Sequence, residues 1–319
     1  AALFGIYFLY QNCDSLTFTA DGALRASSIV EHGGFLLVTA FVMLLGFGVK
    51  AGMFPMHAWL PTAHPVAPAP ASAVLSAVIV KAGVLAISRV LGMFGKDFLR
   101  GTWVQSVWIS LTLVTVFMGS LLAYREPVLK KRLAYSTVSQ LSYILFGLAV
   151  MQETAFTGAL CHVLAHGFIK ASLFLCAGAI IYKTGKTRVG ELRGIGKEMP
   201  LTMWCFTIAS LGLIGIPPTG GFVSKWYLAL GSLKSGLPVF DVLGPVILLV
   251  SALLTAGYLL PPVIHGFFPG ADYDYGSLQN KEPCRLMTVP IFILTTASVF
   301  IGLFPDSVSG IIAAAFTGR

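Results

Sequence analysis

Four lysines lie inside stretches of the sequence that are otherwise apolar, and their positions say most about the chemistry of this chain. They are Lys50, Lys81, Lys170 and Lys225. A charged side chain at the centre of a bilayer costs about 3 kcal/mol on insertion scales, and such residues usually face a protein interior or a water-filled path. Four of them in one chain therefore indicate a relay for charge or protons rather than a passive scaffold.

Two histidines share an apolar stretch with one of these lysines. His162, His166 and Lys170 follow one another at intervals of four residues between Thr154 and Tyr182. At 3.6 residues per turn, an α-helix places them within about 80° of one another, on one face. Histidine titrates near neutrality and burial favours the neutral form of lysine, so this face could pass protons. Histidines that only pack against neighbouring helices are one alternative. A zinc site is disfavoured, because HVLAH lacks the glutamate of HExxH.

Two apolar stretches are interrupted by helix-breaking residues, one after Lys50 and one before Lys225. Proline removes a backbone donor and clashes with the preceding turn, so each run should end one half-helix and begin another. Unpaired backbone at membrane depth is tolerated only inside protein or beside water, and paired broken helices indicate the ion path of a transporter. Ordinary loops between short helices are the alternative. The segments expected to be non-helical are 51–55 and 216–221, with Gly52, Pro55, Pro217, Pro218, Gly220 and Gly221 as the breaking residues.

Composition indicates an integral membrane protein, since 56% of the 319 residues are hydrophobic and 11% are charged. We predict an all-α fold, a polytopic transmembrane helix bundle that forms a single domain over residues 1–319. Because the sequence opens inside an apolar segment, we also expect that earlier helices are missing. A partial span at 1–10 and a short apolar tail at 308–316 flank eight predicted spans: 34–64 (broken), 70–93, 103–124, 133–151, 154–182, 200–234 (broken), 243–268 and 286–304.

Basic residues concentrate in alternate loops between these spans. Of 21 lysines and arginines, eleven fall in one set of loops and five in the other. The positive-inside tendency therefore places the loops 124–133, 183–199 and 269–285 in the cytoplasm. The formal net charge of +8 thus reflects topology, and no segment is long enough to form a soluble basic face for nucleic acid. We expect the protein in the inner cell membrane.

Acidic residues are missing from the centres of the predicted spans, because all 13 aspartates and glutamates fall in loops or at span ends. Buried lysines are costly unless they are neutral or paired. They are therefore either partly neutral or paired with a carboxylate from sequence outside this chain. The sequence contains no P-loop, GxGxxG motif or haem ligand set, and its five cysteines form no CxxC motif. We expect no catalytic residue, metal or cofactor in this chain.

Four ordered motifs resemble the antiporter-like subunits of respiratory complex I. They are similar also to the D-type subunits of multisubunit sodium/proton antiporters and to membrane subunits of membrane-bound hydrogenases. The motifs are VKAGMFPMHAWLPTAHPVAPAPASAVLSAVIVKAGVLAISR, LKKRLAYSTVSQLSYILFG, HVLAHGFIKASLFLCAGAII and LIGIPPTGGFVSKWYL. The resemblance implies a fourteen-helix core with two inverted five-helix repeats, each containing a broken helix. This chain would supply helices six to fourteen of that core.

The resemblance also implies roles for individual residues. It assigns a proton relay to Lys50, Lys81, His162, His166, Lys170 and Lys225. Lys130 matches a basic residue at the cytoplasmic start of its helix, and His57 follows the first break, so both are candidates for proton uptake. The coupling glutamate of that family lies on the fifth helix and has no counterpart in this chain.

Together these features predict a proton-translocating membrane subunit of a respiratory, hydrogenase or cation/proton antiporter complex, with sodium coupling left open. Lys50 and Lys81 would load a proton, the histidine face would carry it, and Lys225 would exchange it with one side. Redox cofactors and any NADH:quinone or hydrogenase chemistry would belong to partner subunits, which would include homologous antiporter-like subunits. Two alternatives remain: a solute-specific secondary transporter with a substrate cavity, and a structural subunit that does not conduct.

Overall fold

The computed structural model describes residues 2–13, 22–270, 273–274, 279–308 and 310. Its named elements are all helices, in agreement with the predicted all-α bundle. In chain order they are α1 (Ala2–Asn12), α2 (Ala26–Lys50), α3 (Trp59–Val66), α4 (Ala69–Val74), the π-helix η1 (Leu75–Ile79), α5 (Lys81–Phe94), α6 (Lys96–Leu99), α7 (Trp103–Arg125), α8 (Leu129–Ala149), α9 (Glu153–Thr184), the 3-10 helix η2 (Val189–Leu192), α10 (Ile195–Glu198), α11 (Pro200–Ile214), α12 (Gly220–Leu233), α13 (Phe240–Phe267) and α14 (Arg285–Leu303).

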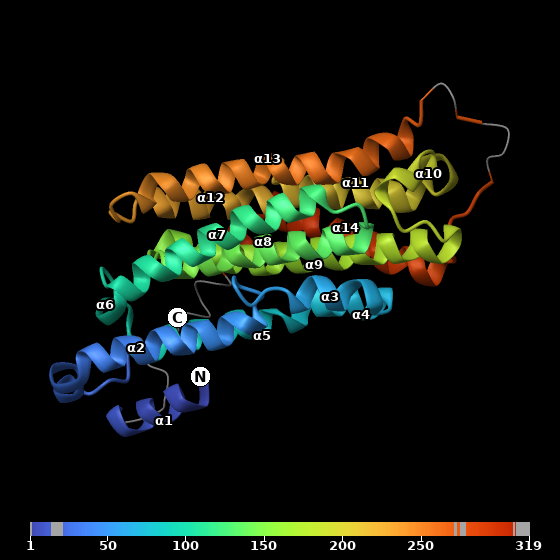
Figure 1. The fold of residues 1–319 in the computed structure, drawn as a ribbon. Coiled ribbons are helices and arrows are strands. Elements are labelled where there is room, and N and C mark those ends of the chain that lie inside the picture. The colour runs from blue at the N-terminus through green and yellow to red at the C-terminus, as the bar shows by residue number, and fades with distance from the viewer. Residues whose placement is uncertain (1, 14–21, 271–272, 275–278, 309, 311–319) are drawn as a thin grey trace.

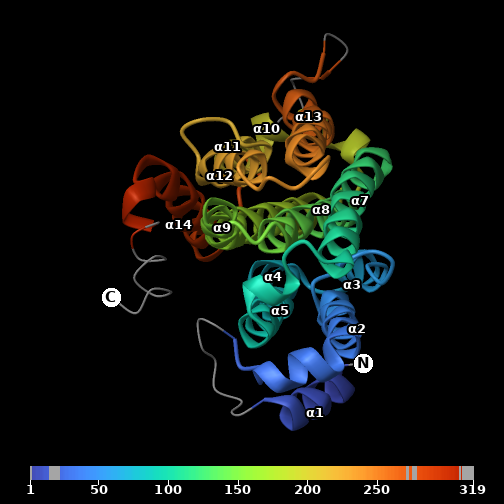
Figure 2. The same ribbon diagram turned by 90° about the vertical axis from the view of Figure 1, so that its left-hand side faces the viewer.

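The long helices run roughly along one direction (Figure 1). Seen along that direction in Figure 2, α8 and α9 form the middle of the bundle, with α11, α12 and α13 on one side and α2 to α5 on the other. Helix α14 packs beside α9, and α7 packs along α8. Side chains on α8 and α9 are therefore surrounded by other helices, whereas α14 and α13 present much of their surface to the outside.

Within the described residues, six helical segments are long and apolar enough to cross a membrane: Ala26–Lys50, Ala69–Phe94, Trp103–Arg125, Glu153–Thr184, Phe240–Phe267 and Arg285–Leu303. The remaining two predicted spans correspond to α8 and to the α11–α12 pair. Helix α2 begins at Ala26, before the predicted start of the first span at residue 34, with a polar part that includes exposed Glu31 and His32. The backbone is non-helical at His32 (φ −127°, ψ 18°), so a kink lies just before the predicted start. The predicted partial span at the start is α1, and most of the predicted apolar tail lies outside the described residues.

Helix α8 is the most buried of the long helices although its sequence is polar. Eighteen of its 21 residues are buried, including three serines and Gln140. Its hydroxyl groups bond across helix contacts: Ser139 Oγ lies 2.8 Å from Ser120 Oγ of α7, which lies 2.6 Å from Ser251 Oγ of α13. Small hydroxyl side chains let membrane helices approach closely and bond to one another. Polarity in α8 therefore indicates a central position rather than exposure.

Both predicted breaks are present. Helix α2 ends at Lys50 and α3 begins at Trp59, so residues 51–58 are non-helical; α11 ends at Ile214 and α12 begins at Gly220. The prediction was wrong at Gly220 and Gly221, which form the first turn of α12. They are glycines because α12 passes very close to its neighbours: a Cβ on Gly221 would overlap the Gly212 carbonyl oxygen, and one on Gly220 would lie 2.8 Å from Ile301.

The predicted span at 70–93 corresponds to the helical segment Ala69–Phe94, within which the π-helix η1 lies between α4 and α5. Within it the Val80 N–H donates to the Leu75 carbonyl at 3.2 Å, a bond to the fifth residue back. Such π-bulges are rare and are often found at functional sites. This one lies directly before Lys81.

Candidate functional site

Lys81 and His166 bring α5 and α9 into direct polar contact. The Lys81 Nζ lies 3.0 Å from Nδ1 of His166 and also donates to the Ser76 carbonyl at 2.7 Å. Ser76 belongs to the π-helix, whose changed hydrogen-bond pattern leaves this carbonyl available to the lysine. His166 is completely buried. The local distortion of the helix therefore positions the lysine amine against the histidine ring.

His162, one turn before His166, connects α9 to α8 and α12. Its Nε2 lies 3.0 Å from Gln140 Oε1, and its Nδ1 lies 2.7 Å from Ser224 Oγ. The Ser224 hydroxyl also lies 3.1 Å from the Gly221 carbonyl. A hydroxyl has one proton to donate. It can donate to neutral His162, or donate to Gly221 while accepting from His162 once that ring is protonated.

Lys170 is completely buried on the same face of α9, as the spacing of the three residues predicted. Its Nζ donates to the Leu133 carbonyl at 2.9 Å and to the Ser136 hydroxyl, both on α8. The rings of His162 and His166 have their centroids 5.9 Å apart. The face of α9 that carries these three residues therefore points into the bundle, towards α5, α8 and α12, rather than towards lipid.

Lys225 reaches back from α12 across the second break. Its Nζ donates to the carbonyls of Leu213 and Ile214, the last two residues of α11, at 2.6 and 3.0 Å. These carbonyls lie at a helix C-terminus, where the backbone carries a partial negative charge. The same Nζ lies 5.0 Å from the ring centroid of Tyr143 on α8. The lysine thus provides donors for backbone groups that the break leaves without helical partners.

The acceptors of these three lysines are uncharged. Within the described part of the chain, no carboxylate oxygen lies within 4.0 Å of Lys81, Lys170 or Lys225. The described acidic residues lie outside the centres of the spans, as predicted; Asp14, Asp21 and Asp272 lie outside the described residues. A carbonyl or hydroxyl oxygen accepts a hydrogen bond from an amine or an ammonium group alike. A proton can therefore leave such a lysine without breaking an ion pair.

Three other predicted residues lie apart from this group. Lys50 is the last residue of α2 and is exposed, with no hydrogen bond to Lys81 among the described contacts. His57 lies in the first break with its ring 6.0 Å from that of Phe54. Lys130, at the start of α8, donates to the Ala67 carbonyl at 2.6 Å, at the end of α3.

His64 is a further candidate that the sequence analysis missed. It is completely buried, and its ring stacks on Phe174 of α9 with the centroids 4.5 Å apart. Neither ring nitrogen has a hydrogen-bond partner among the described residues. Phe174 lies one turn beyond Lys170, so His64 lies between the histidine face and the end of α3 that Lys130 contacts. A second histidine seven residues after His57 was the available signal, but the direction of the half-helix after a break cannot be read from the sequence.

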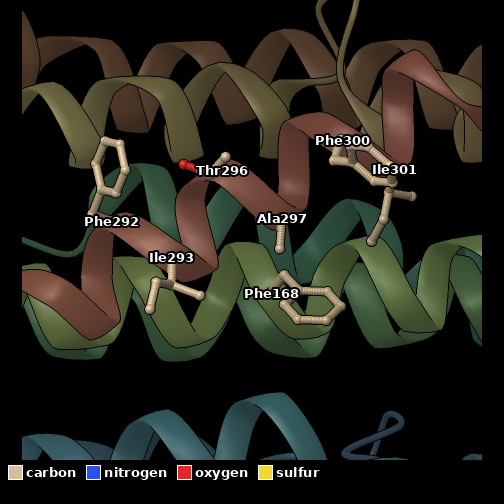
Figure 3. A pocket seen from close by; sticks show the side chains of 7 residues that line it. All are labelled: Phe168, Phe292, Ile293, Thr296, Ala297, Phe300 and Ile301. Atoms are coloured by element: carbon tan, nitrogen blue, oxygen red, sulfur yellow. The ribbon is translucent and has the colours of Figure 1, made fainter.

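A cavity of about 470 Å³ lies between α9 and α14, away from these residues (Figure 3). It is lined by Phe168, Phe292, Ile293, Thr296, Ala297, Phe300 and Ile301. Apart from the Thr296 hydroxyl, these side chains offer no hydrogen-bonding group to a polar solute. The cavity does not favour the interpretation of a solute-specific transporter, which requires convergent polar groups around its substrate.

Comparisons with known proteins identify the family of the chain. The family model described as "NADH:quinone oxidoreductase/Mrp antiporter, TM" matches residues 1–255. The chain is 36% identical over 316 residues to NADH-quinone oxidoreductase subunit N of Desulforudis audaxviator, a match that covers 96% of this chain and 62% of that protein. It is 32% identical over 314 residues to the D-type subunit of the Na(+)/H(+) antiporter of Bacillus subtilis, a match that covers 97% of this chain and 61% of that protein.

Among solved structures, a chain of the Mrp complex from Dietzia matches with a TM-score of 0.80 at 24% identity, over 98% of this chain and 64% of that one. That likeness concerns the fold. The chain spans 62% and 61% of the length of the two curated relatives. The family match and the identity to both relatives show that the chain is a multi-pass membrane protein of the NADH:quinone oxidoreductase/Mrp antiporter transmembrane family.

Proposed function

We propose that this chain carries protons through the membrane as part of an antiporter-like subunit of a larger complex. The observation that supports this most directly is the 3.0 Å contact between Lys81 Nζ and His166 Nδ1, which joins two ionisable groups from different helices. His166 in turn neighbours His162. His162 contacts the hydroxyl of Ser224 on α12, the helix that also carries Lys225. Protons would pass along this line between the π-helix and the second break.

The two ends of the line would reach opposite sides of the membrane. At the second break, Lys225 would exchange protons with one side. Towards the other side, Lys170, His64 and Lys130 provide ionisable groups from α9 through α3 to the start of α8. His166 Nε2 and the nitrogen of Gln140 are buried without a protein hydrogen-bond partner in the described residues. Water molecules usually satisfy such groups, and they would bridge the gaps in this line.

The chemistry of these groups favours protons over Na⁺ for this part of the path. Amines and imidazoles bind protons, whereas a sodium ion requires several oxygen ligands and is repelled by protonated lysine. We further propose that the partners are other membrane subunits of the complex, since the two curated relatives named above are a subunit of an oxidoreductase and a subunit of an antiporter. Redox cofactors would belong to those partners, and the inner cell membrane would be the location.

Substitutions at Lys170 test the proposal against a structural role. Proton translocation would be measured in vesicles that contain the whole complex. Lys170→Ala should reduce it to below about a tenth of wild type, because a proton-transfer group typically contributes a hundredfold or more. Lys170→Arg should also fail, because arginine stays protonated and cannot release a proton.

Lys183→Ala is the matched control, because Lys183 lies on the same helix but is exposed at its end. It should pump at the wild-type rate. Near-normal pumping by Lys170→Arg would contradict proton transfer at this residue and would leave a fixed positive charge as its role. A structural role for Lys170 predicts that arginine is tolerated better than alanine, because arginine fills the space and keeps the charge.

The orientation is tested by cysteine labelling. Arg188 and Lys234 are exposed in loops on opposite sides of the broken α11–α12 span. In a Cys284→Ser background, which removes the exposed native cysteine, a membrane-impermeant reagent added to intact cells should label Lys234→Cys and not Arg188→Cys. The basic loop that contains Arg188 is predicted to be cytoplasmic. The reverse labelling pattern would invert the orientation.

A further inference from the structure

Tyr143 occupies the place where α8, α9, α12 and α13 meet. Its side chain is completely buried, and its hydroxyl donates to the Leu248 carbonyl of α13 at 2.8 Å. Its ring stacks against that of His162, with centroids 5.7 Å apart and an interplanar angle of 24°. The side-chain nitrogen of Lys225 lies 5.0 Å from the same ring centroid. One aromatic ring therefore contacts both His162 and Lys225, between which the last proton transfer of the proposed relay would take place.

The ring distinguishes the two protonation states of Lys225. The face of an aromatic ring carries partial negative charge and attracts a cation, more strongly where water is excluded, but it does not attract a neutral amine in this way. Lys225 is part-buried, and its other polar partners are two carbonyl oxygens. Of the lysines in the proposed relay, Lys225 is the one with a cation–π contact among the described residues. The other described cation–π contacts of lysines are those of Lys131 and Lys183, which lie at helix ends and outside the relay.

Tyr143 itself keeps its proton in this arrangement. Its hydroxyl already donates to the Leu248 carbonyl, which lies outside the line of proton carriers. The transfer moves one proton from the His162 imidazolium to the Lys225 amine, which becomes an ammonium group. Tyr143 contributes the ring face beside which that ammonium is held.

We propose that Tyr143 is a positioning residue that stabilises the protonated form of Lys225 through its ring face and thereby sets how firmly the last relay site holds its proton. The inference rests on the proposed proton relay. Lys225 has no carboxylate partner among the described residues. The ring face of Tyr143 would supply negative electrostatic potential there without carrying a formal charge. The titratable groups on α9 that lie close enough to interact electrostatically with Lys225 are His162, His166 and Lys170. Tyr143 faces it from α8.

The test varies the charge on the ring face without changing the shape of the ring. Phenylalanine and its 4-fluoro, 3,5-difluoro and 3,4,5-trifluoro derivatives would replace Tyr143 in the full complex, and proton translocation would be measured against pH in vesicles. Fluorine withdraws electron density from the ring face and weakens cation–π attraction. The protonated form of Lys225 should become about tenfold less favoured across the series, so the alkaline limit of translocation should move to lower pH by about one unit.

Phe146 provides the matched control, because it is a completely buried ring on the same helix that packs towards Gly244 of α13 rather than on a relay residue. The same fluorinated residues at position 146 should leave the alkaline limit unchanged. A second series at position 143, with 3-fluoro- and 3,5-difluorotyrosine, keeps the bond to Leu248 and serves if the phenylalanine forms fail to assemble.

The outcomes separate this inference from the proposed function. A shift that grows with fluorination at position 143 and not at 146 supports the role of the ring. An unchanged alkaline limit through the series at 143, in a complex where Lys225→Met stops translocation, overturns the role of Tyr143 and leaves the relay in place. Full translocation by Lys225→Met overturns the relay itself.

Discussion

The two broken helices leave backbone carbonyls without helical partners at comparable places, and the chain satisfies them in different ways. At the first break, the Val49 carbonyl accepts a hydrogen bond from the indole nitrogen of Trp59 at 2.8 Å. At the second, the Leu213 and Ile214 carbonyls accept from the Lys225 amine. An indole donor never changes its charge, whereas an amine can gain or lose a proton. The donor at the first break therefore cannot change its charge, whereas the donor at the second is the lysine of the proposed relay.

The lysines beside the two breaks also point in different directions. Lys50 ends the first half-helix and is exposed, whereas Lys225 lies in the second half-helix and reaches back across its break. The first break is also longer, and the Phe54 N–H within it donates to the Thr115 hydroxyl of α7 at 3.1 Å. The two lysines thus differ in whether the side chain reaches the carbonyls that its break frees. In the proposed relay, we use this difference to distinguish Lys225 from Lys50.

The largest difference between the breaks should appear when Lys225 is replaced. Lys225→Met keeps most of the length of the side chain but removes the amine, and with it the proposed proton carrier and the hydrogen bonds to the Leu213 and Ile214 carbonyls. Translocation in vesicles should fall below about a tenth of wild type. The two carbonyls would lose their partners, at about 1–3 kcal/mol each. Blue native electrophoresis of the complex would show whether the subunit still assembles, and an assembled variant that pumps normally would contradict the comparison.

The second break should also be less tolerant of added volume. A Cβ on Gly221 would overlap the backbone oxygen of Gly212, and backbone cannot move aside as a flexible side chain can. Gly221→Ala should therefore lower the free energy of unfolding by about 3 kcal/mol, as overpacking does at its upper range. Thermal denaturation of the purified complex would measure this effect.

Gly52 is the counterpart at the first break. A Cβ there would meet Leu60 at 3.5 Å, an ordinary contact, although the backbone has a φ of +73°. Gly52→Ala should cost about 1–2 kcal/mol from the left-handed conformation alone. Equal destabilisation by the two alanines would show that the close contact at Gly221 costs no more than the left-handed conformation at Gly52, and would contradict the lower tolerance of the second break.

Residue types and spacing were enough to predict much of this site. The interval of four residues between His162, His166 and Lys170 placed them correctly on one buried face, and the glycine and proline runs located both breaks. These are local signals, because a helix of known pitch and the missing N–H of proline act within a few residues. Family resemblance added the order of the elements along the chain.

Other features depend on contacts between distant segments and could not be derived in this way. The acceptor of Lys81 exists because a π-helix forms at Leu75–Ile79, and the apolar sequence there does not differ from that of an ordinary helix. The position of Tyr143 beside His162 and Lys225 depends on the packing of α8 against α9 and α12. The exposure of Lys50 follows from the direction in which α2 ends. Gly220 and Gly221 resembled breaking residues because close helix contact and helix termination both select glycine.

Trp59 gives the smallest effect and the sharpest check of the comparison. Trp59→Phe removes the indole donor and keeps an aromatic side chain, so the Val49 carbonyl keeps its bond from the Gly52 N–H at 3.0 Å but loses its second donor, and no titratable group is affected. The free energy of unfolding should fall by about 0.5–1.5 kcal/mol, the net contribution of one hydrogen bond, measurable as a lower thermal midpoint. Translocation by the assembled complex should stay within about twofold of wild type, because the substitution does not change the barrier to proton transfer. A change of about 1.4 kcal/mol in that barrier would lower the rate tenfold. If Trp59→Phe instead stopped pumping as completely as Lys225→Met, the first break would also take part in proton movement, and the distinction between the two breaks would be wrong.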